Sequence, residues 1–138
     1  MIVDSSALLA VLNRESDADL FQDAMLTASP CRMSVAKVLE VSIVVEGRGG
    51  AEAGRELDAF LERAEIEPAP VTAEELEAAR QAWRRFGKGR HPAALNFGDC
   101  FAYALAQTTG EPLLFKGEDF ARTDIPAALS RLAEPSSR

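Results

Sequence analysis

Short apolar runs alternate with longer amphipathic stretches along the chain. The runs at 1–3, 31–34, 66–71 and 112–115 have the length of short strands. Between them, the segments 7–13, 16–28, 35–46, 51–64 and 73–86 repeat apolar residues at helical spacing, as does the stretch that follows residue 98. Prolines within 66–71 predict a strand that is short or lies at an edge. A final helical turn or two is expected at 127–132.

Several residues mark the ends of the predicted helices. Thr72 followed by Glu75 is the pattern of a capping box. Asn96 and Gly98 form a start signal for the helix of the motif LNFGDCFAYALAQ. Gly47 is expected to end the helix at 35–46, before the chain loosens at 49–50.

The alternation of strands and helices predicts the class of fold. The connections are long enough for helical crossovers, which favours a parallel sheet with helices on both faces. At 138 residues the chain has the length of one domain. We expect this domain to span residues 1–133 and residues 134–138 to form a flexible C-terminal tail.

Composition narrows the class of protein. A hydrophobic share of 47% and a charged share of 27% are ordinary for a soluble globular protein. No apolar run approaches the roughly 20 residues of a membrane span, and the start MIVDSSALLAVL lacks the basic region of a signal peptide. Cys31 and Cys100 are far apart, which argues against a disulfide framework and for a reducing cytoplasm.

The charge is unevenly distributed. A formal net charge of -7 excludes overall attraction to a polyanion. Residues 80–91 reverse this sign with five cations, which are Arg80, Arg84, Arg85, Lys88 and Arg90. Trp83 and Phe86 lie among them, so the segment is a candidate site for the phosphates of a nucleic acid. The alternative is a solvated helix end whose cations favour the helix dipole. The single histidine, His91, is expected to be structural.

Four acidic residues stand in unusual surroundings. Asp4 and Asp119 each follow a short apolar strand, where parallel sheets place their ligand sites. Glu40 lies in a helix that is apolar on nearly every face, and Asp99 lies in the first turn of its helix. Each also has a structural explanation: Asp4 could cap a helix, Lys37 could pair with Glu40, and Asp99 could interact with the helix dipole.

Taken together, the acids favour a metal site. In a parallel sheet the four carboxylates would converge at one edge and repel each other unless a hard cation lay among them. Ligands that are all oxygen suit Mg²⁺ or Mn²⁺, and the cysteines and histidine have no zinc spacing. A bound Mg²⁺ lowers the pKa of a water and holds a phosphate oxygen, as hydrolysis of a phosphodiester requires. The chain contains no nucleophile elbow, Walker A loop or dinucleotide fingerprint.

The chain resembles the PIN-domain ribonucleases, and more narrowly the VapC toxins of bacterial toxin–antitoxin pairs. The resemblance rests on MIVDSSALLAVL, on Glu40 in its apolar helix, and on GKGRHPAALNFGDCFAYALA and PLLFKGEDFARTDI. It implies a three-layer α/β/α sandwich with a short parallel sheet, whose acidic pocket binds Mg²⁺, or Mn²⁺ as a substitute, and cleaves RNA to leave a 5′-phosphate and a 3′-hydroxyl. It also implies a homodimer and a VapB-type antitoxin that blocks the pocket.

The resemblance carries over to individual residues. Asp4 and Asp99 match the two acids most directly tied to the metal, and Glu40 matches the acid of the third helix. Many relatives have a further aspartate where this chain has Gly117, so Asp119 or Glu118 must supply the fourth carboxylate. Two other groups of residues are implied to support the site: Ser6 as a hydroxyl beside the first acid, and Arg84, Arg85, Lys88 and Arg90 as contacts to RNA.

Other functions remain open at this stage. One alternative is a related nuclease that acts on DNA or in RNA maturation. Another is a catalytically idle PIN fold that serves as a binding module, although the presence of the acids weighs against it. For the partner proteins, the apolar residues of the early helices could form either the dimer seam or the antitoxin groove; these are Leu8, Leu9, Leu12 and Phe21.

Overall fold

Four short parallel strands form the sheet at the centre of the computed structural model, which describes residues 1–129. The strands are β1 (Ile2–Val3), β2 (Cys31–Ser34), β3 (Ile66–Ala69) and β4 (Leu113–Leu114). They are ordered β3-β2-β1-β4, and every pairing is parallel. The proline-containing strand β3 therefore lies at an edge, as its sequence predicts.

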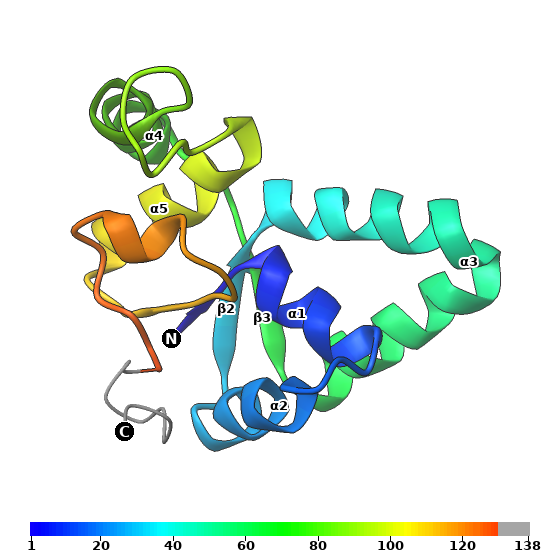
Figure 1. The fold of residues 1–138 in the computed structure, drawn as a ribbon. Coiled ribbons are helices and arrows are strands. Elements are labelled where there is room, and N and C mark those ends of the chain that lie inside the picture. Colours follow the sequence, from blue (N-terminus) through cyan, green and yellow to red (C-terminus); the bar gives the residue numbers. More distant parts are fainter. Residues whose placement is uncertain (130–138) are drawn as a thin grey trace.

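Helices connect the strands and cover both faces of the sheet (Figure 1). They are α1 (Ser5–Leu12), α2 (Ala18–Thr27), α3 (Val35–Arg63), α4 (Ala73–Phe86) and α5 (Phe97–Thr109), with a short 3-10 helix, η1, at Phe120–Arg122. Helices α4 and α5 lie on one side of the sheet, and α1, α2 and the second half of α3 lie on the other.

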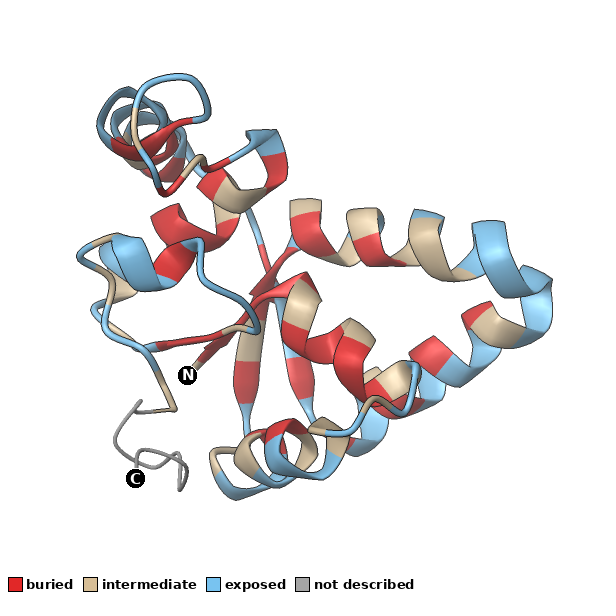
Figure 2. Ribbon diagram, in the orientation of Figure 1, coloured by how far each residue is buried: buried red, intermediate tan, exposed pale blue. Residues whose placement is uncertain are grey.

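Two hydrophobic clusters fill the space between these three layers. Neighbouring residues in a strand point to opposite faces, so Ile2 and Leu113 join the cluster beneath α4 and α5, whereas Val3 and Leu114 join the cluster beneath α1, α2 and α3. Figure 2 shows this burial along the strands and on the helix faces turned toward them. The fold is a three-layer α/β/α sandwich with a short parallel sheet, and the predicted fold class is confirmed.

Most predicted helix boundaries agree with the structure. The side chain of Thr72 accepts a hydrogen bond from the backbone N–H of Glu75, and α4 ends at Phe86 as expected. Gly47 does not end a helix, which corrects the predicted boundary. Because glycine only weakens a helix without forbidding it, α3 continues until Gly50, whose φ of 71° interrupts the helical geometry.

Other expectations need correction. Residues 127–129 are not helical, and the rest of the segment expected as a final turn, like the predicted tail at 134–138, lies outside the described residues. Leu8 and Phe21 are buried in the core, so neither is available for a partner protein. Within residues 1–129 no helix is both long and apolar enough to cross a bilayer. Both cysteines are free and buried.

Candidate active site

Asp4 lies directly after β1, where it caps α1. Its Oδ2 accepts a hydrogen bond from the Ser6 backbone N–H at 3.0 Å, which satisfies one of the free amide groups at the helix start. The residue is only 2% exposed. Its other oxygen, Oδ1, accepts no hydrogen bond from any described residue and lies 3.4 Å from the Nζ atom of Lys37. The predicted cap is thus present, and one buried carboxylate oxygen remains available.

Lys37 and Glu40 extend from α3 toward this aspartate. The Lys37 Nζ atom lies 2.6 Å from Oε1 of Glu40, and the Ser5 hydroxyl donates a hydrogen bond to the same oxygen at 2.9 Å. Lys37 is 2% exposed, whereas the Glu40 side chain is 41% exposed. Glu40 lies in the second turn of α3, which begins at Val35. A single buried ammonium therefore pairs with the first two carboxylates and offsets one of their two negative charges.

The pKa of Lys37 reflects these neighbours. Burial alone would lower it, but the carboxylates of Asp4, Glu40 and Asp99 outweigh burial and raise the pKa above the ordinary lysine value. Lys37 therefore stays charged at neutral pH. The stability that it contributes is fully present below the unfolded-state pKa and is lost only as the pH rises through the raised value.

Asp99 is held at the start of α5 by a complete capping box. The Asn96 side chain accepts from the Asp99 backbone N–H at 2.9 Å, and the Asp99 carboxylate accepts from the Asn96 N–H at 3.0 Å. Burial raises the pKa of Asp99, and the charges of Asp4 and Asp119 raise it further, against the opposing effects of the Asn96 N–H and Lys37. Three of the predicted acids therefore interact electrostatically, and Asp99 takes up a proton at a higher pH than an ordinary aspartate.

Gly98 lets α5 approach α3 closely. A Cβ atom at this position would lie 2.2 Å from Oε2 of Glu40 and 3.2 Å from Nζ of Lys37. The absence of a side chain is what allows Glu40 to stand against the start of the helix that carries Asp99. A separate hydrogen bond joins α1 to the loop before Asp119. The Ser6 hydroxyl accepts it from the Lys116 backbone N–H at 2.9 Å.

Substituting Gly98 with alanine is expected to impair the site more than the fold. The new methyl group must displace the flexible Glu40 carboxylate, so we expect Mn²⁺ affinity, measured by calorimetry, to fall about tenfold while the melting temperature changes little. Gly47→Ala is the matched control, because a Cβ there meets nothing within 4 Å and alanine favours the helix. Equal Mn²⁺ affinity in both variants would contradict the assigned role of Gly98.

The chemistry of these side chains fits a hard divalent cation. The candidate donors are all carboxylate oxygens, and the buried Oδ1 of Asp4 has no hydrogen-bond donor. The acids are not drawn together as a finished coordination shell: within residues 1–129, no three His, Cys, Asp or Glu side chains lie close enough to hold an ion. Lys37 lies between Asp4 and Glu40 instead. A cation entering here would share or replace the contacts of that ammonium.

The basic segment divides into two groups. Arg84 and Lys88 line a pocket between α4 and α5, and the Arg90 guanidinium lies 4.2 Å from the ring centre of Trp83. Arg85 turns elsewhere, because its guanidinium pairs with Asp124 at 3.1 Å. His91 accepts a hydrogen bond from the Ala93 N–H through Nδ1, at 3.0 Å, which is the structural role expected of it.

Sequence reasoning missed Ser5 and predicted only one of the two contacts of Lys37, its pair with Glu40. The Ser5 hydroxyl was not expected to touch Glu40, because nothing in the order of Ser5 and Ser6 says which one faces α3. Lys37 was visible as a neighbour of Glu40 one turn away. Its contact with Asp4 and its burial depend on packing between two elements and left no signal in the local pattern.

Comparison with known proteins establishes the family. The PIN domain profile matches residues 1–126, and the chain belongs to the PIN domain family. It is 52% identical over 127 residues to a ribonuclease VapC of Mycolicibacterium smegmatis, covering 92% of this chain and 98% of that protein. It is 51% identical over 125 residues to ribonuclease VapC30 of Mycobacterium tuberculosis, covering 91% and 95%.

A solved structure supports the fold independently. The crystal structure of Mycobacterium tuberculosis VapC20, described as a toxin that cleaves the sarcin–ricin loop, superposes with a TM-score of 0.71. The match covers 90% of this chain and 95% of that one at 20% identity, so it bears on the fold alone.

Proposed function

We propose that this protein is the toxin of a toxin–antitoxin pair and a metal-dependent endoribonuclease of the VapC type. The observation that carries the proposal is that the carboxylates of Asp4, Glu40 and Asp99 all act on one buried ammonium, that of Lys37, in a chain that shares about half its residues with VapC ribonucleases. The family implies a divalent metal cofactor. The rival interpretation, an idle binding module, would not require this cluster of acids.

Asp4, Glu40 and Asp99 would hold the metal, with Mg²⁺ as the natural ion and Mn²⁺ as a substitute. When bound, the ion supplies an activated water and a contact for a phosphate oxygen. The protein contributes rigid placement. Asp4 and Asp99 are each fixed by a helix cap, and Ser5 orients Glu40. Asp4 Oδ1 accepts no hydrogen bond from the described residues and contacts the Lys37 ammonium, so a cation would have to share or displace that ammonium to reach it.

Asp119 is proposed as the fourth acid in preference to Glu118. Its charge contributes to the raised pKa of Asp99, which places it within electrostatic reach of the other acids. The hydrogen bond between Lys116 and Ser6 supports this assignment, because it anchors the loop that carries Asp119 beside the first acid.

Arg84, Lys88 and Arg90 are proposed to contact the RNA backbone, since the first two line the same pocket and Arg90 covers Trp83. Arg85 stays a weaker candidate, because binding a phosphate would require it to exchange its exposed ion pair with Asp124.

The partners proposed for the chain are a second copy of itself and a VapB-type antitoxin. Exposed apolar side chains on α3 support a protein interface there, because Val35, Leu39 and Ile43 are spaced four residues apart and are 42%, 61% and 64% exposed. This face takes the place of the buried Leu8 and Phe21 as a candidate partner surface, whereas Leu9 and Leu12 are only partly buried and remain candidates. The reduced state of Cys31 and Cys100 is consistent with a cytoplasmic setting.

The experiment that tests the function is cleavage of total cellular RNA by purified protein free of antitoxin. We expect a discrete set of products with Mg²⁺ or Mn²⁺, none with EDTA, and recovery when metal is restored. In the same assay Asp119→Asn should lose more activity than Glu118→Gln. Intact RNA in every lane, from protein shown to be folded, would favour the binding module. Cleavage of DNA at the same rate would favour the related nucleases.

A further inference from the structure

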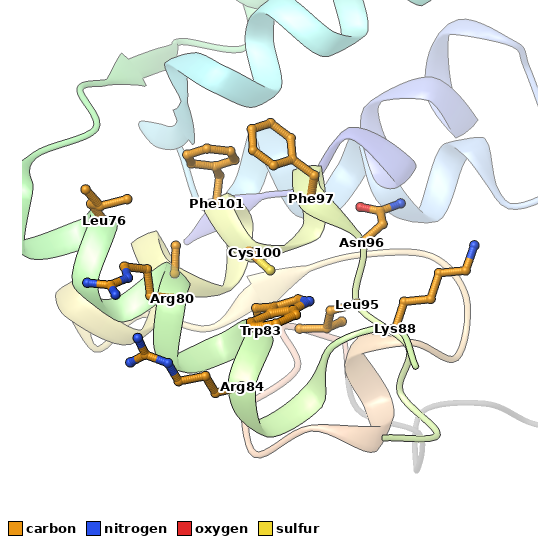
Figure 3. A pocket seen from close by; sticks show the side chains of 11 residues that line it. Leu76, Arg80, Trp83, Arg84, Lys88, Leu95, Asn96, Phe97, Cys100 and Phe101 are labelled. Atoms are coloured by element: carbon orange, nitrogen blue, oxygen red, sulfur yellow. The ribbon is translucent and has the colours of Figure 1, made fainter. Parts of the chain in front are cut away.

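A large pocket lies between α4 and α5, apart from the acids. Its volume is about 590 Å³, and eleven residues line it. Figure 3 shows Trp83 on the side of α4, Phe97 and Phe101 on the side of α5, and the Cys100 sulfur between them. The open space is therefore bounded by aromatic rings that come from two different helices.

The apolar side chains of this pocket are unusually exposed. Phe97 is 83% exposed, Leu76 52% and Trp83 46%. A soluble protein gains nothing from exposing a cluster of large apolar side chains, so such clusters mark binding sites. The Phe97 and Phe101 rings meet edge to face with their centres 5.0 Å apart. Arg90 lies over the Trp83 ring at 4.2 Å, which adds a positive charge beside the aromatic surface.

Cations flank the aromatic rings. Arg80 and Arg84 lie on one side of Trp83 and Lys88 on the other (Figure 3). Glu77 pairs with both arginines, at 3.2 Å and 3.8 Å, but exposed ion pairs of this kind are weak and exchange readily for a phosphate. In a protein of net charge -7, this combination of rings and cations matches single-stranded nucleic acid, whose bases stack while its phosphates pair.

The pocket and the acids share one helix start. Asn96 lines the pocket and also caps the helix turn that holds Asp99, and Phe97 precedes Gly98, which packs against Glu40. The start of α5 therefore contributes residues both to the pocket and to the surroundings of the acids, so one RNA could contact both. This continuity favours RNA as the occupant over a second protein.

We propose that the pocket formed by Trp83, Phe97 and Phe101 binds an unpaired base of the RNA, next to the phosphate that is cleaved. The inference rests on the proposed ribonuclease function and adds a base-binding site to it. Single-stranded RNA is commonly recognised by stacking of splayed bases on aromatic side chains. The pocket would thereby restrict cleavage to single-stranded or looped segments, because a base held in a duplex cannot enter it.

The single tryptophan of the chain makes this pocket directly observable. Because Trp83 is the only tryptophan, fluorescence excited selectively at tryptophan, without Tyr103, reports on the pocket. We would titrate the protein, in EDTA to prevent cleavage, with a short single-stranded RNA and with an abasic strand of equal length and charge. Stacking is expected to quench Trp83 with the RNA, whereas the abasic strand should bind about tenfold more weakly and leave the fluorescence nearly unchanged.

Two variants separate base stacking from phosphate binding. Phe97→Ala keeps the fluorescent reporter, and Trp83→Ala can be followed by anisotropy of a labelled RNA. Each is expected to lower the affinity for RNA by about tenfold to a hundredfold and to leave the affinity for the abasic strand unchanged. Because Trp83→Phe keeps an aromatic ring, its affinity for RNA should stay within about threefold of that of the unaltered protein. Leu20→Ala is the control, since Leu20 is 55% exposed on α2, outside the pocket.

Each outcome decides between the occupants. If Phe97→Ala and Trp83→Ala lost equal affinity for the RNA and for the abasic strand, the pocket would contact only phosphates, and the proposal would be overturned. Unchanged RNA binding together with a fall in sedimented mass would identify a protein interface and overturn it equally. The ribonuclease function fails separately: if the unaltered protein quenches with RNA but cleaves none in Mn²⁺, the base site stands and the nuclease assignment falls.

Discussion

Replacing Asp4 with asparagine is expected to abolish RNA cleavage while leaving the fold intact. Asparagine is as good a helix cap as aspartate, so its amide oxygen can still accept the hydrogen bond from Ser6. What it removes is the negative charge of a carboxylate that is 2% exposed and has one oxygen without a donor. With the charge gone, a divalent cation loses the carboxylate that lies between β1 and α1.

We expect kcat/KM on a model RNA to fall by about 10³-fold or more, which corresponds to roughly 4 kcal/mol of transition-state stabilisation. The matched control is Asp17→Asn, because Asp17 also stands at a helix N-cap but lies at α2 and pairs with the exposed Lys116. Thermal unfolding of both variants checks the fold. Full metal-dependent cleavage by the Asp4 variant would remove Asp4 from the catalytic group.

Replacing Lys37 with methionine is expected to produce the largest loss of stability in the absence of metal. The substitution preserves the apolar stem but removes the ammonium that lies near Asp4 and Glu40. Breaking a buried pair by removing one partner leaves the other charge uncompensated, at a cost of about 3 kcal/mol or more. For a chain of this length, we expect the melting temperature in EDTA to fall by roughly 10 °C.

A divalent ion should then reverse most of that loss. Without Lys37, the carboxylates should bind Mn²⁺ more tightly, because no ammonium competes with the ion. Mn²⁺ should therefore raise the melting temperature of the Lys37 variant more than that of the unaltered protein. Lys116→Met is the control: that lysine pairs with Glu15 and Asp17 but is exposed, so its removal should change stability little and independently of metal. If Mn²⁺ stabilised both proteins equally, Lys37 would not share the cation site.

Much of this protein was predictable from local pattern. Apolar runs of a few residues between amphipathic segments are sufficient to indicate parallel strands joined by helices, because the two periodicities differ. Caps are equally local: Asn96 and Thr72 bond to atoms three residues away, so their roles follow from the sequence alone. Asp4 and Asp99 were identifiable as candidates for the same reason, since each stands at a recognisable strand end or helix start.

Where helices end and which faces remain exposed was harder to predict. The sequence predicts a helix end at Gly47, but α3 continues to Gly50, which has the positive φ. Both halves of α3 then contribute buried residues to one hydrophobic cluster, a contact that the local pattern does not record. The apolar residues of α1 and α2 could not be divided into core and surface from periodicity alone. Leu8 and Phe21 became core, while Phe97 of α5 stayed exposed.

The sequence by itself predicted the class of fold, the caps at Thr72 and Asn96, and four candidate acids, because each of these predictions depends on residues a few positions apart. Only the tertiary structure decided how the acids are neutralised and what lies beside them. Lys37 reaches Asp4 across 33 positions, and Gly98 meets Glu40 from another helix. Arg85 pairs with Asp124, and Trp83 and Phe97 come to line the same pocket. Contacts between distant segments arise from packing of whole elements, and no local pattern records them.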